Sequence, residues 1–236
     1  MSGHSKWSTI KRAKGANDAK RGALFTKLGN QIAIAARGGA DPKMNAALAL
    51  AIEKARAANM PNANVERSIA RAAAGSATAL EEVVYEAYGQ GGTAIIIETA
   101  TDNRNRTFPD VRSTLNKNGG NIAESGSVMF NFDRKGVIQV AAVGEDALLA
   151  ILEAGAEDAV EEDGEMVVYT GAKELAAVRE KIIAAGLTVK DFGLEYVPKN
   201  QVAISDEATA GKLLKLLDAL DELDDVVGVH TNADLG

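Results

Sequence analysis

The sequence GSATALEEVVYEAYGQGGTAIIIET, residues 75–99, contains the point where the chain changes from helical to strand-like periodicity. Before it, apolar residues recur every three or four positions, and after the polar joint at 75–78 they approach alternation. Residues 82–88 and 93–99 are predicted strands, and the GQGG segment at 89–92 is predicted to be the turn of a hairpin. The sequence therefore predicts a helical N-terminal part followed by mixed helix and strand.

Three helices are predicted before the joint, and their short connections suggest a small bundle. The first is expected at about 18–37 and ends at Gly38-Gly39. The second is expected to begin at Asp41-Pro42, because an aspartate cap followed by proline is typical of a helix start, and to run to Met60. The third is expected from about residue 62 to Gly75.

The part after the joint is predicted to contain two α/β modules. The first continues with a helix at 104–118 and a strand at 127–132, and the chain then enters a βαββαβ series typical of a ferredoxin-like unit. The elements of that series are expected at 136–141, 145–154, near 159, 166–170, 173–185 and 189–197. A final strand, helix and strand at 201–204, 206–223 and 226–230 would return to the first module and complete its sheet.

The predicted fold class is therefore α+β, with a three-helix N-terminal domain and two α/β sandwich-type domains, one inserted into the other. The expected domains are a basic helical domain at 1–78, a discontinuous α/β domain at 79–132 plus 199–236, and an inserted ferredoxin-like domain at 133–198.

The charge of the chain also differs between the part before the joint and the part after it. The formal net charge is -7, but residues 1–75 hold 13 Lys and Arg against 4 Asp and Glu, a net of +9, so residues 76–236 carry -16. Such a division is typical of a nucleic-acid-binding or anionic-surface module joined to an acidic body.

The basic residues gather most densely before and within the first predicted helix. Lysine and arginine neutralise backbone phosphates whatever the base sequence, so this segment is predicted to bind nucleic acid. The alternative is a solvated basic face; a membrane-surface helix is disfavoured because the apolar stripe is narrow. The candidate residues are Lys6, Trp7, Lys11, Arg12, Lys14, Lys20, Arg21 and Lys27.

A second candidate is the segment DNRNRT at 102–107, at a junction between strand and helix. A helix N-terminus favours anions, so Arg104 and Arg106 are predicted to hold a phosphate there. Equally, the two arginines could pair with Glu98 or Glu124.

Signatures of enzymes and metal sites are missing from the sequence. The chain has no cysteine, its two histidines are His4 and His230 at opposite ends, and no Gly-Lys-Ser/Thr phosphate loop occurs. The acidic runs at 161–163 and 221–225 lack regular ligand spacing and are interpreted as solvated turns. We therefore expect no catalytic residues and no metal or other cofactor. No apolar run approaches the length of a membrane span, so we expect no membrane contact.

Several segments, in order along the whole chain, resemble the YebC family. They are MSGHSKW at 1–7, DAKRG at 18–22, FTKL at 25–28, YEAYGQGGTA at 85–94, DNRNRT at 102–107 and GSV at 126–128. The family includes bacterial proteins named probable transcriptional regulators and a mitochondrial translational activator of cytochrome c oxidase subunit I. The resemblance implies three domains, the third inserted into the second.

The expected function is that of a non-enzymatic, nucleic-acid-binding regulator of gene expression. The family leaves two targets open: DNA, for a transcriptional regulator, and ribosomal RNA, for a ribosome-associated translation factor, with the ribosome or the transcription machinery as candidate partners. An enzyme with a site in an interdomain cleft and a protein-interaction scaffold using the acidic domains remain as alternatives. Because nothing precedes the HSKW motif except residues 1–3, no organelle transit peptide is expected and the protein is assigned to the cytoplasm. The sequence sets no oligomeric state.

Overall fold

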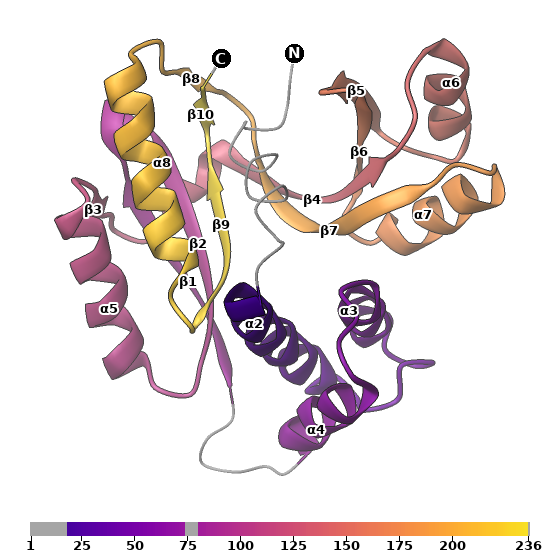
Figure 1. The fold of residues 1–236 in the computed structure, drawn as a ribbon, viewed down its shortest axis with the longest axis horizontal. Helices are drawn as coiled ribbons and strands as arrows, with labels where there is room; N and C mark the ends of the chain where they lie inside the picture. Colours follow the sequence, from indigo (N-terminus) through magenta and orange to yellow (C-terminus); the bar gives the residue numbers. More distant parts are fainter. Residues whose placement is uncertain (1–17, 74–79, 236) are drawn as a thin grey trace. The chain divides into compact units, whose positions relative to one another are not determined.

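The computed structural model describes the backbone of residues 18–73 and 80–235 and the side chains of 21–72 and 80–235. The chain divides into two compact units: residues 132–199 form one, and the described residues on either side of them form the other (Figure 1). None of the described helices is both long enough and apolar enough to cross a membrane.

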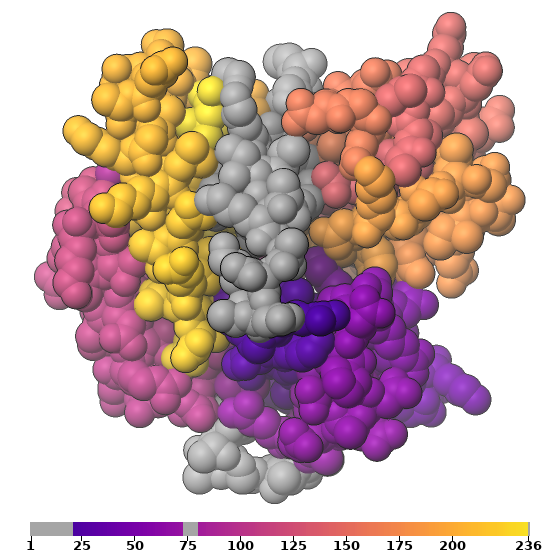
Figure 2. Space-filling view, in the orientation of Figure 1, coloured from indigo at the N-terminus to yellow at the C-terminus, as the bar shows by residue number. Residues whose placement is uncertain are grey.

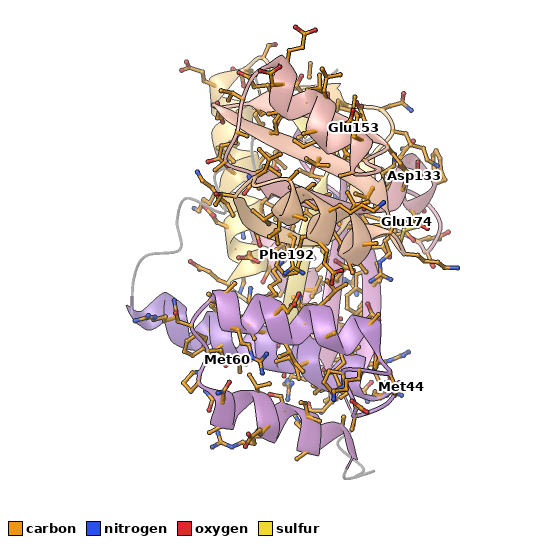
Figure 3. The ribbon with its side chains drawn as sticks, turned by 90° about the vertical axis from the view of Figure 1, so that its right-hand side faces the viewer. Met44, Met60, Asp133, Glu153, Glu174 and Phe192 are labelled. Atoms are coloured by element: carbon orange, nitrogen blue, oxygen red, sulfur yellow. The ribbon has the colours of Figure 1, made fainter. Side chains whose placement is uncertain are left out.

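Three helices open the larger unit: α2 (Asp18–Ala36), α3 (Ala46–Ala57) and α4 (Asn62–Ala73). Their core is built from aliphatic side chains at three-to-four spacing, among them the fully buried Ile32 and Leu48. Met60, at the turn between α3 and α4, is also part of this core, whereas Met44 before α3 is 87% exposed (Figure 3). The helical N-terminal part predicted from the sequence is confirmed.

The start of α3 differs from the prediction. The helix begins at Ala46 rather than at Asp41-Pro42, because Asn45 is a better cap in this setting. Its Oδ1 accepts the N–H of Leu48 at 3.1 Å, and its Nδ2 donates to the carbonyl oxygens of Ala35 and Gly39. One side chain thus caps α3 and fixes the turn that follows α2.

The sheet of the larger unit has the order β3-β1-β2-β9, with all neighbours antiparallel. Its strands are β1 (Glu81–Tyr88), β2 (Ala94–Thr101), β3 (Asn121–Ile122) and β9 (Val226–Thr231). The turn between β1 and β2 is the short 3-10 helix η1 (Gln90–Gly92), in which Gly91 has φ of 70°. A side chain there would be strained and would also meet Ile204.

Two helices, α5 (Arg104–Lys117) and α8 (Glu207–Asp221), lie against one face of this sheet (Figure 1). They pack side by side, and their segments are neighbours on the surface in Figure 2. The core between them and the sheet contains Ile95 and Ile97 of β2, Leu115 of α5 and Leu213 of α8, all fully buried. Every residue of β2 is buried, which agrees with its position in the middle of the sheet. A short parallel pair, β8 (Val202–Ala203) with β10 (Ala233–Asp234), completes the unit.

The prediction of a strand at residues 127–132 is wrong. Residues 129–131 form the 3-10 turn η2 (Met129–Asn131), and strand pairing begins only at Phe132. The reason is Glu86 on β1, whose carboxylate accepts the N–H groups of Gly126, Val128 and Met129 at 2.5, 2.7 and 2.8 Å. Backbone donors that a neighbouring strand would have used are taken by this one side chain.

The smaller unit is a ferredoxin-like βαββαβ fold, and this part of the predicted fold class is confirmed. Its sheet order is β5-β6-β4-β7 with all neighbours antiparallel. Gly136 on β4 faces Leu175 of α7 and Thr170 of β6 so closely that a Cβ atom would collide with both. The elements are β4 (Phe132–Val140), α6 (Glu145–Glu153), β5 (Asp158–Glu162), β6 (Glu165–Gly171), α7 (Leu175–Ala184) and β7 (Val189–Pro198).

Candidate nucleic-acid interface

Most of the predicted phosphate-binding residues precede the described part of the chain. Lys6, Trp7, Lys11, Arg12 and Lys14 lie outside the described residues, and Lys20 is in α2 but its side chain is not described. Arg21, one residue later, is exposed on the first turn of α2. Their assignment as nucleic-acid contacts therefore stays a prediction.

Lys27, two turns further along α2, has a different environment from the one expected of a phosphate ligand. Its Nζ donates to the backbone carbonyl of Asp221 and lies 3.1 Å from the Oδ1 atom of the same residue, at the end of α8. Only 14% of the Lys27 side chain is exposed. A cation at the C-terminus of a helix is favourable for the α8 dipole, so Lys27 joins α2 to α8.

The arginines of the 102–107 segment are both paired with carboxylates. Arg104 Nε lies 2.6 Å from Glu81 Oε2, and Arg106 NH2 lies 2.8 Å from Asp225 Oδ2 and 3.2 Å from Asp102 Oδ1. The pKa of Arg106 is raised by its hydrogen bonds to Asp225 and by the negative charge of Asp225, so its guanidinium is held in the charged form. Arg104 and Arg106 therefore pair with carboxylates, as the alternative interpretation predicts, but their partners are not Glu98 or Glu124.

The start of α5 explains why these residues come together. Asn103 caps the helix, its Oδ1 accepting the N–H of Arg106 at 3.2 Å. The buried Thr107 places its Oγ1 2.6 Å from Asp225 and 2.7 Å from Thr101 Oγ1. The cap and the buried hydroxyl together hold Arg106 beside Asp225.

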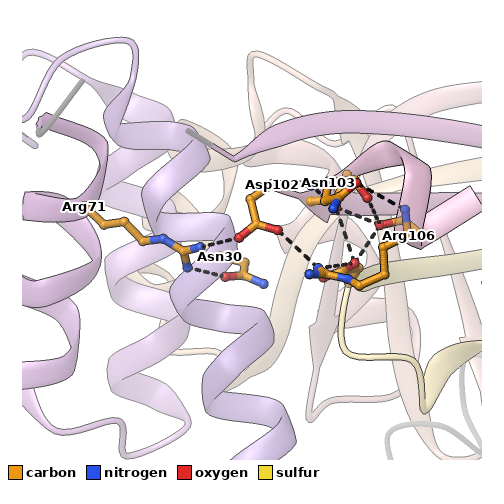
Figure 4. A network of polar contacts seen from close by, with 8 residues as sticks. Asn30, Arg71, Asp102, Asn103 and Arg106 are labelled. Atoms are coloured by element: carbon orange, nitrogen blue, oxygen red, sulfur yellow. Dashed lines mark hydrogen bonds and ion pairs between the residues drawn. The ribbon is translucent and has the colours of Figure 1, made fainter. Parts of the chain in front are cut away.

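A series of polar contacts that the sequence does not predict continues from Arg106 into the helical part of the same unit. Asp102 also lies 3.7 Å from Arg71 NH2 of α4, and Arg71 NH1 donates to Asn30 of α2 at 3.3 Å (Figure 4). Asn30 is 7% exposed. A buried polar residue close to the apolar stripe of a helix is a signal that it needs a partner, but the sequence does not identify which.

A pocket of about 610 Å³ lies along this series of polar contacts. Its walls carry five carboxylates, from Asp102, Asp110, Glu222, Asp224 and Asp225, against the two guanidinium groups of Arg71 and Arg106. Because the excess charge is negative, this pocket disfavours phosphate. The phosphate-binding role of Arg104 and Arg106 stays a prediction, and their described surroundings do not favour it.

Of the two histidines, His4 lies outside the described residues and His230 lies on β9. The Nε2 atom of His230 on β9 lies 2.8 Å from Glu98 Oε2 on β2, with 11% of each side chain exposed. Among the described residues, no group of three or more His, Cys, Asp or Glu side chains is arranged to hold a metal ion. His230 thus has a structural partner across the sheet.

Comparison with known proteins agrees with this architecture over the whole chain. Residues 5–75 match the TACO1/YebC protein N-terminal domain, and residues 80–233 match the TACO1/YebC second and third domain. A crystal structure of a conserved hypothetical protein, Aq1575 from Aquifex aeolicus, superposes with a TM-score of 0.85 at 43% identity, covering 92% of this chain and 91% of that one.

Two curated relatives are similar over nearly their full lengths. A probable transcriptional regulatory protein of Rubrobacter xylanophilus is 51% identical, and one of Moorella thermoacetica is 48% identical; in both cases the match covers 100% of this chain and 96% of the relative. On these matches, the chain belongs to the TACO1/YebC family.

Proposed function

We propose that this protein is a non-enzymatic regulator of gene expression that binds nucleic acid through phosphate contacts of its N-terminal part. The observation that carries the proposal is the net charge of +9 on residues 1–75 beside -16 on the remainder. Counterion release from phosphates supplies most of the affinity of such a basic segment. We also propose that the protein acts in the cytoplasm.

The ion pairs of the larger unit support the proposal that phosphate binds to the N-terminal part of the chain. Arg104 and Arg106 are matched by carboxylates of the α/β part, so they add little positive field. In the helical part, α3 and α4 carry exposed basic side chains, among them Arg56 and Arg67. Attraction for phosphate is therefore concentrated at the N-terminal end of the chain.

The arrangement of the helices favours a preformed phosphate surface over a sequence-specific operator. In a helix-turn-helix module, the second helix projects base-reading side chains into the major groove. Here both α3 and α4 pack mainly on α2, and Arg71 of α4 is engaged by Asn30 and Asp102. We infer weak sequence discrimination and take structured ribosomal RNA as the first candidate target.

Regulation of transcription through DNA is the second candidate, and the relatives favour it. The similar proteins of Rubrobacter xylanophilus and Moorella thermoacetica carry the name probable transcriptional regulatory protein. Bent or looped DNA presents a phosphate surface comparable to that of folded RNA, so one basic segment suits either target.

The first test is the salt dependence of binding. If five to seven phosphates are contacted, log affinity for duplex DNA falls against log salt with a slope of about -4.5 to -6. Reversing Lys11, Arg12 and Lys14 to Glu should weaken binding to every sequence tested. Reversal of the exposed Lys173, Lys181 and Lys212 is the matched control, because it changes the net charge equally. Salt-independent binding, or equal losses in the two triple variants, contradicts the proposal.

The second test separates the two targets. We expect the protein to sediment with ribosomes from a cell lysate, and the reversal of Lys11, Arg12 and Lys14 to abolish this while the control triple variant does not. On short duplex DNA we expect each mismatched base pair to cost less than the ~1–3 kcal/mol typical of an operator reader. A defined operator bound orders of magnitude more tightly than random DNA, without ribosome association, would decide for transcription.

A further inference from the structure

The solvent-facing side of α5 holds a shallow groove of about 370 Å³, separate from the acidic pocket at the start of the helix. This volume lies in the range of ~300–1,000 Å³ that is typical of small-molecule sites. The groove is lined by Phe108, Pro109, Arg112, Ser113, Asn116 and Lys117, so it combines an aromatic ring, two cations and two uncharged polar groups.

The aromatic ring of the groove is exposed yet held in place from behind. Phe108 is 39% exposed, and its ring centroid lies 5.8 Å from that of Tyr85 on β1, with the planes inclined by 45°. Tyr85 is half-buried against the core of the unit. Phe108 therefore presents to solvent a ring that packs against Tyr85.

The cations of the groove differ from those at the start of α5. Whereas Arg104 and Arg106 are paired with carboxylates, neither Arg112 nor Lys117 makes an ion pair or side-chain hydrogen bond with any described residue. Both side chains are exposed, on a part of the chain whose excess charge is strongly negative. The two unmatched cations beside an exposed ring give the groove a local positive charge, and this combination is suited to an anionic aromatic ligand.

We propose that this groove binds one nucleotide of a single-stranded nucleic acid. The base stacks on Phe108, Arg112 and Lys117 contact the flanking phosphates, and Ser113 and Asn116 supply hydrogen bonds to the base edge or sugar. Stacking platforms combined with cations are the general means by which proteins hold single strands. A duplex does not fit this role, because its bases are already stacked on one another. The inference rests on the proposed function and adds to it a second contact with the same nucleic acid.

The test uses the full-length chain and a fluorescent reporter inside the groove. Trp7 is the one tryptophan in the sequence, so a Trp7→Phe, Phe108→Trp variant carries its only indole in the groove. We expect ten-residue oligouridylate and oligodeoxythymidylate to quench this indole, since stacked bases contact it directly. Tighter binding of the oligouridylate would assign the site to RNA, and equal binding would assign it to single strands of either kind.

Charge reversal provides the matched comparison. Arg112→Glu with Lys117→Glu should abolish the quenching, whereas Lys212→Glu with Lys215→Glu on α8, an equal charge change at two exposed lysines, should leave it. In the otherwise unchanged protein, Phe108→Ala should weaken binding of the single strand about 5- to 10-fold, the lower end of the effect of stacking one base, and leave duplex binding unchanged.

The outcomes distinguish this site from the proposed N-terminal one. Quenching that persists when Lys11, Arg12 and Lys14 are reversed supports the groove even if the N-terminal proposal fails. Binding that depends on those three residues but not on Phe108, Arg112 and Lys117 overturns the groove alone. Equal losses in the two double variants, or equal effects of polyglutamate and oligonucleotide on the indole, overturn it as well, because they indicate attraction of any polyanion.

Discussion

At the scale of single residues, Glu86 has a structural role that the sequence does not reveal. It is a carboxylate on a strand, 5% exposed, and it organises a loop about forty residues away through three backbone N–H groups. Burial alone would raise the pKa of Glu86, but the donors from Gly126, Val128 and Met129 outweigh it and lower the pKa below the ordinary value. The ionised form is therefore the one that the fold stabilises.

Replacement of Glu86 by Gln should destabilise the protein by about 1.5–3 kcal/mol at neutral pH, because hydrogen bonds to a charged acceptor are lost. The lowered pKa means that this contribution is complete above the ordinary glutamate pKa, near pH ~4.3, and is lost as the pH falls towards the folded-state value. Urea unfolding of both proteins at pH 7 and near pH 3 measures it. A deficit of the same size at both pH values would show that charge is not involved.

A sequence pattern cannot reveal such a residue. Alternation in 82–88 correctly predicts a strand, yet the same alternation in 127–132 predicts a strand that does not exist. The difference depends on which acceptor the backbone N–H groups of the second segment find, and that is a tertiary property. The predicted start of α3 at Asp41-Pro42 is wrong for a related reason, because contacts of Asn45 with the end of α2 set the start of the helix at Ala46.

At the scale of elements, the start of α5 shows how a helix is positioned by a residue far along the chain. Asp225, in the loop between α8 and β9, receives bonds from Arg106 and Thr107, and its backbone carbonyl accepts the N–H of Ala100 at 2.8 Å. The sequence predicts α5 and its asparagine-rich start correctly. Arg106 pairs with Asp225, which comes close only when the C-terminal segment packs on the sheet. Local sequence spacing therefore could not predict this partner.

We expect Asp225→Ala to lower the free energy of unfolding by about 1.5–3 kcal/mol, since it removes the charged acceptor of the buried Thr107 hydroxyl. Asp224→Ala is the matched control, because its side chain is exposed and makes no hydrogen bond or ion pair with any residue that the structure describes. The two variants are compared by chemical denaturation. Equal stabilities of both variants would contradict the role assigned to Asp225.

At the scale of the whole molecule, the two units differ in whether they are built from one continuous segment of the chain. The smaller unit is a single segment, and its first and last strands are neighbours, with Phe132 paired to Pro198. Directly opposed residues in an antiparallel pair lie about 4.5–5.5 Å apart, so the chain leaves and re-enters the larger unit at adjacent points. The insertion therefore places no demand on the geometry of the sheet that contains β1, β2 and β9.

This arrangement predicts that residues 131–200 fold when expressed alone, because domains of comparable size commonly do so. Circular dichroism should show mixed helix and strand, and urea should unfold the fragment in one cooperative transition. A fragment that lacks such a transition would show that the unit needs the rest of the chain.

The discontinuity of the larger unit has a consequence for the order in which the protein is made. β2, whose Ile95 and Ile97 are fully buried in the finished protein, leaves the synthesis machinery long before α8 and β9, the elements that cover and pair with it. At 5–20 residues per second, the delay between residues 101 and 226 is roughly 6–25 seconds. During that interval the inserted unit is synthesised in full and can fold first, while the open side of β2 is an unpaired apolar edge. The nascent chain is thus vulnerable to aggregation at β2, and α8 and β9, which are translated much later, are the elements that protect this strand.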